Sequence, residues 1–388
     1  MYDKGSTAAI TRRLHRALLE RGDSSLVLYG RGAASQESGT RKLVPEIYAK
    51  ANHLRADLSG LMYGGCELAT ARLCAVLQHE KPDAVHLQCI NGYFVNIPRL
   101  IAYLKENKIP TLLTLHAEFM YTANCSHAFD CERWRGGCGG CPDHRRQTHS
   151  LFRDASAASW QRMAAAFDGF EKLTVVSVSP WQRMRAEASP FFRGARHVTI
   201  GNGVDTRVFA PRDAGAHERP RILHVTPHFT DEAGHIKGGE YVIRLAEALG
   251  ERAEILVVGP GRAERVPDNV RFLGPVWDTK KLAELYADAD LTLLTSRRET
   301  FSMVCAESLC CGTPVVGFEA GGPESIALPA YSAFVPWGDV DALRDACLAS
   351  LGRRTAQTEL AREAAEHYGN ERMIREYFNE YEKARVRP

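Results

Sequence analysis

Two glutamates eight residues apart, Glu299 and Glu307, stand in the most informative stretch of this sequence. They follow an apolar run at residues 291–294 that predicts a buried strand. A helix is expected over residues 301–311, with Gly312 as its stop signal. Glu299 then lies in the loop and Glu307 lies about two turns into the helix. The first amides of a helix have no partner within it and attract anions, most often phosphate, so the pattern predicts an anion site beside two carboxylates.

The predicted anion donors are the amides of Phe301, Ser302, Met303 and Val304. Alone this pattern is common, because acidic residues at such a spacing are usually solvated surface. The wider segment Ser296 to Gly322 resembles the donor-binding motif of retaining glycosyltransferases of family 4, which have the two-Rossmann-domain GT-B architecture. The resemblance includes Cys311-Gly312-Thr313-Pro314-Val315-Val316 and Gly321-Gly322-Pro323-Glu324. It implies that Glu299 contacts the donor sugar, that Glu307 holds the ribose hydroxyls and that the four amides hold the diphosphate.

Lys237, in the stretch His235-Ile236-Lys237-Gly238-Gly239, is the expected cation of the site. An isolated lysine before two glycines is more often a solvated surface residue. In the family that this sequence resembles, a lysine here neutralises the donor diphosphate. That role suits the chemistry, because the leaving group gains negative charge as the glycosidic bond breaks. Many members also carry an arginine several residues earlier; here either His228 supplies that second charge or the charge is absent.

His116 ends an expected strand at residues 111–115. A lone histidine there is more often a capping or packed residue. However, Thr114-Leu115-His116 resembles the family's cleft histidine, which lies near the donor sugar and the acceptor, although Ala117 and Glu118 follow where aspartate is usual. The resemblance therefore implies a catalytic set of His116, Lys237 and Glu299.

Two weaker candidates complete the donor site, namely Gly5 and Phe272. Gly5 matches a glycine loop that approaches the donor phosphate, and Phe272 lies in a stretch whose backbone is expected to meet the nucleobase. The chain enters a helical pattern ending at Gly22 without the buried strand that normally opens a Rossmann domain. Either the true start codon lies upstream, which we favour, or the sheet tolerates the loss.

Four of the eleven cysteines form the cluster Cys125-x5-Cys131-x6-Cys138-x2-Cys141. Disulfides are rare in a reducing cytoplasm, and four thiolates suit tetrahedral zinc. The first two spacings are looser than a Cys-x2-Cys pair, so free thiols or a labile disulfide are the alternative. The cluster, with Trp134, resembles one branch of family 4 typified by colanic-acid glycosyltransferases. We expect a structural zinc that shapes the acceptor side and does no chemistry.

Asp288-Ala289-Asp290 has the form of a metal-binding Asp-x-Asp, but it leads from a helix into a buried strand and resembles a structural stretch of the GT-B fold. No catalytic metal is therefore expected. A formal net charge of +2 gives no sign of a nucleic-acid partner. No apolar run approaches the roughly 18 residues of a membrane span, and no leader pattern opens the chain. We expect a cytoplasmic protein with at most peripheral membrane contact.

Expected strands and helices alternate along the chain, which predicts an α/β fold with parallel sheets. The resemblance makes this two Rossmann-like domains facing across a cleft (GT-B). Residues 1–202 form the acceptor domain with an inserted four-cysteine loop at 117–150, residues 203–370 form the donor-nucleotide domain, and a helix over residues 371–388 crosses back. The predicted strands are 25–29, 84–89, 111–115, 174–177, 198–200, 222–226, 255–258, 270–273, 291–294 and 315–318.

The function implied by the resemblance is retaining transfer of a hexose or amino-hexose from a nucleoside-diphosphate sugar, with UDP expected, to a hydroxyl of a carbohydrate-like acceptor. The sequence shows no obvious basic amphipathic face for a membrane, which favours a soluble acceptor. The Arg- and Ala-rich composition indicates a G+C-rich bacterial genome, and the expected acceptor is therefore an aminocyclitol or aminoglycoside antibiotic intermediate. The alternative acceptor is a lipid-linked exopolysaccharide. A UDP-sugar epimerase and a non-catalytic nucleotide-sugar-binding module are the alternatives from other classes.

Overall fold

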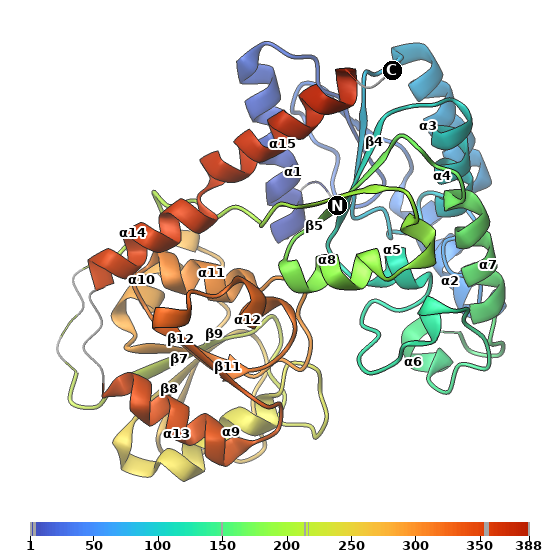
Figure 1. The fold of residues 1–388 in the computed structure, drawn as a ribbon. Helices are drawn as coiled ribbons and strands as arrows, with labels where there is room; N and C mark the ends of the chain where they lie inside the picture. Colours follow the sequence, from blue (N-terminus) through green and yellow to red (C-terminus); the bar gives the residue numbers. More distant parts are fainter. Residues whose placement is uncertain are drawn as a thin grey trace. The chain divides into compact units, whose positions relative to one another are not determined.

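A computed structural model of the protein describes residues 2, 5–148, 150–212, 215, 217–352 and 357–386 (Figure 1). The chain forms two compact units: unit 1 is Met1–Ile200 with Ile374–Pro388, and unit 2 is Gly201–Met373. The predicted segments 1–202, 117–150 and 371–388 extend at some positions beyond the described residues. None of the helices in the described residues is long and apolar enough to cross a membrane.

Unit 2 is built on a six-stranded parallel sheet of order β12-β11-β10-β7-β8-β9. Read from β9 this is 3-2-1-4-5-6, the order of a doubly wound sheet whose connections change direction between β7 and β10. The central strands are almost wholly buried, as expected of a parallel sheet with helices on its faces. The strands are β7 Arg221–Val225, β8 Glu254–Val258, β9 Val270–Gly274, β10 Leu291–Leu294, β11 Val315–Phe318 and β12 Ser332–Val335.

The helices of unit 2 cover this sheet with apolar faces. In α9 the buried residues Val242, Leu245, Ala246 and Leu249 recur at helical spacing and pack beside α13. The five strands predicted here are confirmed, whereas β12 was missed because it is a short, partly exposed edge strand. The helices are α9 Gly239–Leu249, α10 Thr279–Asp288, α11 Met303–Cys310, α12 Gly322–Ile326, α13 Val340–Leu351 and α14 Gln357–Tyr368.

Unit 1 contains a four-stranded parallel sheet, β3-β4-β5-β6, and a separate parallel pair, β1-β2. In the described part of the chain the first element is α1, and β1 follows it. The strands are β1 Val27–Tyr29, β2 Thr40–Lys42, β3 Val85–Gln88, β4 Thr111–Leu115, β5 Leu173–Ser177 and β6 Arg196–Thr199.

The helices of unit 1 include α15, which begins at Asn370 and joins this unit from Ile374 onward (Figure 1). Its Glu380 pairs with Arg196 on β6. The helices are α1 Ser6–Arg21, α2 Glu46–Ser59, α3 Glu67–Glu80, α4 Ile97–Glu106, α5 Phe119–Thr122, α6 His144–Thr148, α7 Ser156–Phe167, α8 Pro180–Glu187 and α15 Asn370–Val386.

A buried ion pair fastens the segment after β4, which carries the four cysteines, to α8. The guanidinium of Arg185 lies 3.2 Å from Glu118, whose side chain is fully buried, and 3.0 Å from Glu132. The same guanidinium lies 5.1 Å from the ring centroid of Trp134, which is 1% exposed. Glu118, Glu132 and Trp134 all belong to the segment, so one arginine holds it at three points.

Replacing Arg185 with methionine should therefore destabilise the protein by about 3–5 kcal/mol, because it removes the cation beside the buried Glu118 carboxylate. Adding Glu118→Gln to that variant should recover most of the loss. Arg183→Met is the matched control: Arg183 lies on the same helix in an exposed pair with Glu187, and its loss should cost less than about 0.5 kcal/mol. Thermal unfolding compares the variants, and equal effects at the two arginines would contradict this role.

Candidate functional site

Lys237 and Glu299 meet where the loops after β7 and β10 leave the sheet. The Lys237 Nζ lies 2.5 Å from the Glu299 Oε1, and each side chain is 27% exposed. The Thr295 hydroxyl donates to the Lys237 carbonyl oxygen at 2.9 Å, which joins the two loops through their backbone. In an open α/β sheet, ligands bind outside the carboxyl ends of the strands, where the winding direction changes. The predicted lysine and first glutamate therefore lie together at the expected place.

Two glycines allow the loops around this pair to approach so closely. A Cβ on Gly238 would lie 2.2 Å from the Thr295 carbonyl oxygen, and Gly238 has a φ of +64°. A Cβ on Gly322 would lie 2.4 Å from the carbonyl carbon of Thr300. The Gly322 amide donates to the Glu299 carbonyl oxygen at 2.9 Å, so the loop after β11 fixes the backbone that carries Glu299.

The start of α11 presents unpaired amides next to Glu299. Ser302, with a φ of +81°, caps the helix by accepting from the Cys305 amide at 3.2 Å. Among the described residues, no protein acceptor is recorded for the amides at positions 301–304. Such amides attract an anion, and a phosphate group suits them. The sequence-predicted amides therefore have the local geometry that the prediction requires.

Glu307 lies just over one turn into α11 and is partly exposed. Its Oε2 accepts from the Tyr286 hydroxyl at 3.4 Å. Burial, and after it the nearby Glu307 carboxylate, raises the pKa of Tyr286. The hydroxyl therefore stays protonated and donates its hydrogen bond to the carboxylate. Tyr286 was not predicted as a site residue; its place at the end of α10, opposite the glutamate helix, depends on the tertiary fold.

Other acidic residues of the motifs have structural partners. Glu324 accepts from the Gly321 amide at 2.5 Å and from the Ala320 amide at 3.0 Å, which caps the loop after β11. Asp288 lies 2.7 Å from the Arg221 guanidinium, and Asp290 accepts from the Arg221 amide at 2.7 Å. Asp290 directly precedes β10, at the sheet edge opposite Glu299. The Asp-x-Asp therefore ties strand ends together, in keeping with the structural interpretation.

Phe272, predicted for the donor site, packs its ring edge-on against Phe229 at 4.9 Å between centroids, next to the core of unit 2. Its side chain serves packing, which leaves only its backbone for a nucleobase. His228 is exposed, with its ring 6.4 Å from that of His235 in the loop after β7. Gly5 lies in unit 1 with a φ of +92° at the start of α1, with no atom near its Cβ direction.

His116, also in unit 1, ends a polar chain that runs to the C-terminal helix. Its Nε2 lies 3.2 Å from the Gln88 Oε1. His86 continues the chain, 3.4 Å from the Gln88 amide nitrogen and 2.8 Å from the Tyr381 hydroxyl. Because an amide oxygen only accepts, the proton of a neutral His116 sits on Nε2. Burial lowers the pKa of His116 to about 4, so the ring is neutral at pH 7.

Gln88 was missed by the sequence reasoning. It lies at the end of β3, beside the strand that ends at His116, and the two strands pair in register from Val85 to Gln88. Polar residues at neighbouring strand ends were the available signal. The chain His116–Gln88–His86 fixes the imidazole through groups that are themselves held by α15, so Gln88 orients the histidine.

The four clustered cysteines are all thiols, as are the other seven. Burial raises the pKa of Cys125, and the thiols of Cys138, Cys141 and Cys131 raise it further because they lie near it. Burial also raises the pKa of Cys138 to about 11. However, within the part of the chain that is described, no group of three or more His, Cys, Asp or Glu side chains is arranged to hold a metal ion. The geometry therefore does not support the zinc prediction.

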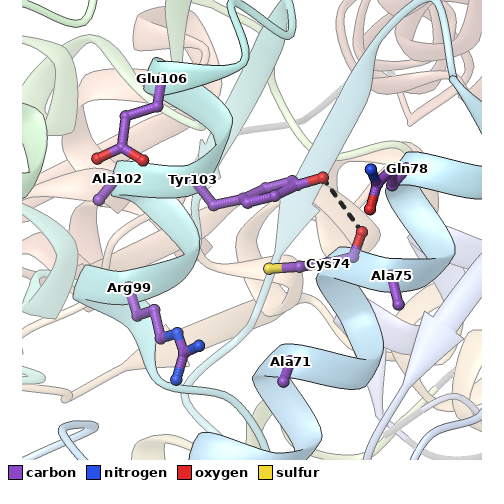
Figure 2. Close-up of a pocket in the computed structure, with 8 residues that line it drawn as sticks. All are labelled: Ala71, Cys74, Ala75, Gln78, Arg99, Ala102, Tyr103 and Glu106. Atoms are coloured by element: carbon purple, nitrogen blue, oxygen red, sulfur yellow. Dashed lines mark hydrogen bonds between the residues drawn. The ribbon is translucent and has the colours of Figure 1, made fainter.

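A groove of about 450 Å³ lies between α3 and α4 in unit 1, away from the strand ends that carry the predicted residues (Figure 2). The Tyr103 hydroxyl crosses it to donate to the Cys74 carbonyl oxygen at 3.2 Å. Its lining residues are Ala71, Cys74, Ala75, Gln78, Arg99, Ala102, Tyr103 and Glu106. No predicted site residue lines it.

Comparison with known proteins identifies glycosyltransferases as similar to this chain. Residues 219–353 match the family described as glycosyl transferases group 1. WcaC of Escherichia coli K12, named as a colanic acid biosynthesis glycosyl transferase, is 21% identical over 98% of this chain and 97% of its own. A D-inositol 3-phosphate glycosyltransferase of Xylanimonas cellulosilytica is 30% identical, over 52% of this chain and 56% of that protein.

Solved glycosyltransferases share the fold across nearly the whole chain. A sucrose-phosphate synthase from Thermosynechococcus elongatus superposes with a TM-score of 0.69 at 17% identity, over 98% of this chain and 93% of the other. Anabaena HepE in complex with UDP superposes with a TM-score of 0.65 at 13% identity, over 99% and 98%. The chain has the GT-B fold. The predicted α/β fold with two Rossmann-like domains is thus confirmed, and the prediction of a hexosyltransferase is confirmed with it.

In this glycosyltransferase, Gly322→Ala should lower stability by about 1–3 kcal/mol, because the new methyl group would overlap the backbone of Thr300. Gly352→Ala is the matched control, since Gly352 has a right-handed helical conformation and its nearest neighbour would be 3.4 Å away. Thermal unfolding measures both. Equal stability of the two variants would show that the loops around Glu299 do not need this close approach.

The lowered pKa of His116 predicts the acid side of the enzyme's pH profile. The folded protein favours the neutral ring. Activity that needs the neutral ring should therefore persist as the pH falls below about 6.5, the ordinary pKa of histidine. It should be lost as the pH approaches about 4. Imidazole NMR, with His116→Asn to assign the signal, measures this titration directly. A His116 signal that titrates near the ordinary value would contradict the buried, neutral histidine.

Proposed function

We propose that this glycosyltransferase moves a hexose or amino-hexose from a UDP-sugar to a hydroxyl of a carbohydrate-like acceptor, with retention of anomeric configuration. The observation that carries the proposal is the Lys237–Glu299 pair beside the unpaired amides of α11. A cation, a carboxylate and a row of amides suit a ligand that joins a diphosphate to a sugar. UDP is chosen because the similar HepE structure holds it.

Donor binding would separate Lys237 from Glu299, because each would then bind a different part of the donor. Lys237 would turn to the diphosphate, and the amides at 301–304 would take its remaining charge. Glu299 would then be released to accept from hydroxyls of the sugar, and Glu307 would accept from the ribose hydroxyls. Since Lys237 and Glu299 already neutralise each other without ligand, neither charge is left exposed and unpaired before the donor arrives.

In the reaction, the bond from the sugar C1 to the diphosphate oxygen breaks and a bond from C1 to the acceptor oxygen forms on the same face. The acceptor proton passes to the departing phosphate oxygen, so no divalent metal and no covalent nucleophile is invoked. Lys237 and the amides stabilise the charge that grows on the leaving group. Neutral His116, whose Nε2–H donates to Gln88, would use Nδ1 to accept from a hydroxyl of the sugar or the acceptor.

For the acceptor, a soluble aminocyclitol or aminoglycoside antibiotic intermediate remains a prediction from composition. The second candidate, a lipid-linked exopolysaccharide, is favoured by the similarity to WcaC, which covers nearly both chains. Side-by-side assays with a soluble aminocyclitol and a lipid-linked sugar separate the two.

Lys237→Gln should weaken UDP binding by roughly 10- to 100-fold, because it removes a charge-assisted hydrogen bond to phosphate. The thermal shift produced by UDP, GDP and dTDP, and by their sugars, measures this, since a ligand of the folded state raises its stability. Lys280→Gln, at an exposed lysine of α10, is the matched control and should bind as the wild type does.

A wild type that no nucleotide stabilises would overturn the donor site. Stabilisation with unchanged turnover in Lys237→Gln and Glu299→Gln would instead overturn their catalytic assignment. Conversion of UDP-N-acetylglucosamine to its epimer, without transfer, would identify the isomerase alternative, and binding without any turnover would identify the non-catalytic module.

We also propose a structural zinc on Cys125, Cys131, Cys138 and Cys141. The closeness of the other three thiols to Cys125 supports it, although the described side chains do not form a metal-binding arrangement. Elemental analysis should find about one zinc per chain, lost in Cys138→Ser with a lower melting temperature. Cys347→Ser, at a buried cysteine of α13, controls for the loss of any thiol. Metal-free protein of full stability would remove this proposal.

A further inference from the structure

The outward face of α2 carries a stripe of large apolar side chains. Its buried residues are the small Ala49 and Ala56. On the opposite face Ile47, Leu54 and Leu58 are 76%, 57% and 47% exposed, and positions 47, 54 and 58 fall on one stripe of a helix. None of these three side chains belongs to the core of unit 1, so the stripe is available to a partner outside it.

The stripe continues into the segment after α6. The Leu151 amide donates to the Asp57 carbonyl oxygen at 2.8 Å, which brings this segment to the end of α2. Leu151 is 53% exposed and Phe152 is 74% exposed. We define the α2 surface as Ile47, Leu54, Leu58, Leu151 and Phe152. Large exposed apolar side chains grouped in this way mark an interaction site rather than ordinary surface.

Exposed cations flank the α2 surface. Lys50 and Arg55 lie to either side of the stripe on α2, and Arg153 follows Phe152. Among the described residues these three cations make no recorded ion pair. The carboxylates of α2 are already engaged, Glu46 with Arg31 at 2.9 Å and Asp57 with His53 at 3.5 Å.

We propose that the α2 surface binds the face of an anionic lipid bilayer, with its leucines and Phe152 among the acyl chains and its cations at the headgroups. An apolar stripe bordered by cations is the pattern that suits such an interface. A second copy of this chain fits less well, because a symmetric contact would bring Lys50, Arg55 and Arg153 of both copies together. The further step, that the acceptor is lipid-linked, rests on the proposed function.

Sedimentation with vesicles tests the surface without any turnover. The wild type should bind vesicles of phosphatidylcholine with phosphatidylglycerol, and bind those of phosphatidylcholine alone more weakly. Leu54→Glu with Leu58→Glu should lower the partition coefficient about tenfold or more, and Lys50→Gln with Arg55→Gln about fivefold for each cation. Leu19→Glu is the matched control, since Leu19 is a 40% exposed leucine on α1, which Figure 1 draws away from α2.

The proposal would be overturned if the wild-type protein did not bind anionic vesicles, or if the glutamate variants bound them as the wild type does. A dimer that the glutamate variants abolish, without vesicle binding, would overturn it in favour of a second copy. Thermal stabilisation by UDP should be unchanged in every variant, since none touches unit 2. Vesicle binding without UDP binding would therefore reject the donor site and keep the surface, and the reverse result would reject only the surface.

Discussion

The close approach of three loops at the carboxyl edge of the unit 2 sheet is the constraint on which the candidate site depends. The loop after β7 carries Lys237, the loop after β10 carries Glu299, and the loop after β11 holds the backbone of Glu299 through Gly322. The strand order brings β7 and β10 side by side, and glycines remove the Cβ atoms that would keep the loops apart. A 2.5 Å ion pair beside unpaired amides is the local result.

Much of this edge could be predicted from the sequence because its signals are local. Apolar runs predicted the strands, and Gly312 marked the end of the glutamate helix. The resemblance then gave roles to Lys237 and Glu299, whose proximity in the fold is compatible with those roles. The residues that were missed, Gln88 and Tyr286, act through partners distant in sequence, so no local pattern identifies them. The ring of Phe272 packs next to the core, so the expected contact of its backbone with a nucleobase stays a prediction.

The structure of unit 1 is harder to predict from the sequence than that of unit 2. Its described strands form two sheets, and its four-cysteine segment is held by one arginine rather than by an observed metal geometry. The spacing of the cysteines predicted a group of four thiols, but the directions of their side chains depend on tertiary packing. The α2 surface was also missed: composition and run length reveal no membrane span, whereas the apolar stripe becomes visible only when the buried side of α2 is known.

The most direct test of the central claim is a crystal structure of the protein with UDP bound. The account predicts diphosphate oxygens within hydrogen-bond distance of the amides at positions 301–304 and of the Lys237 Nζ, with the ribose hydroxyls at Glu307 and the Lys237–Glu299 distance increased. Diphosphate bound elsewhere, with the Lys237–Glu299 pair still intact at its present 2.5 Å, would contradict the account.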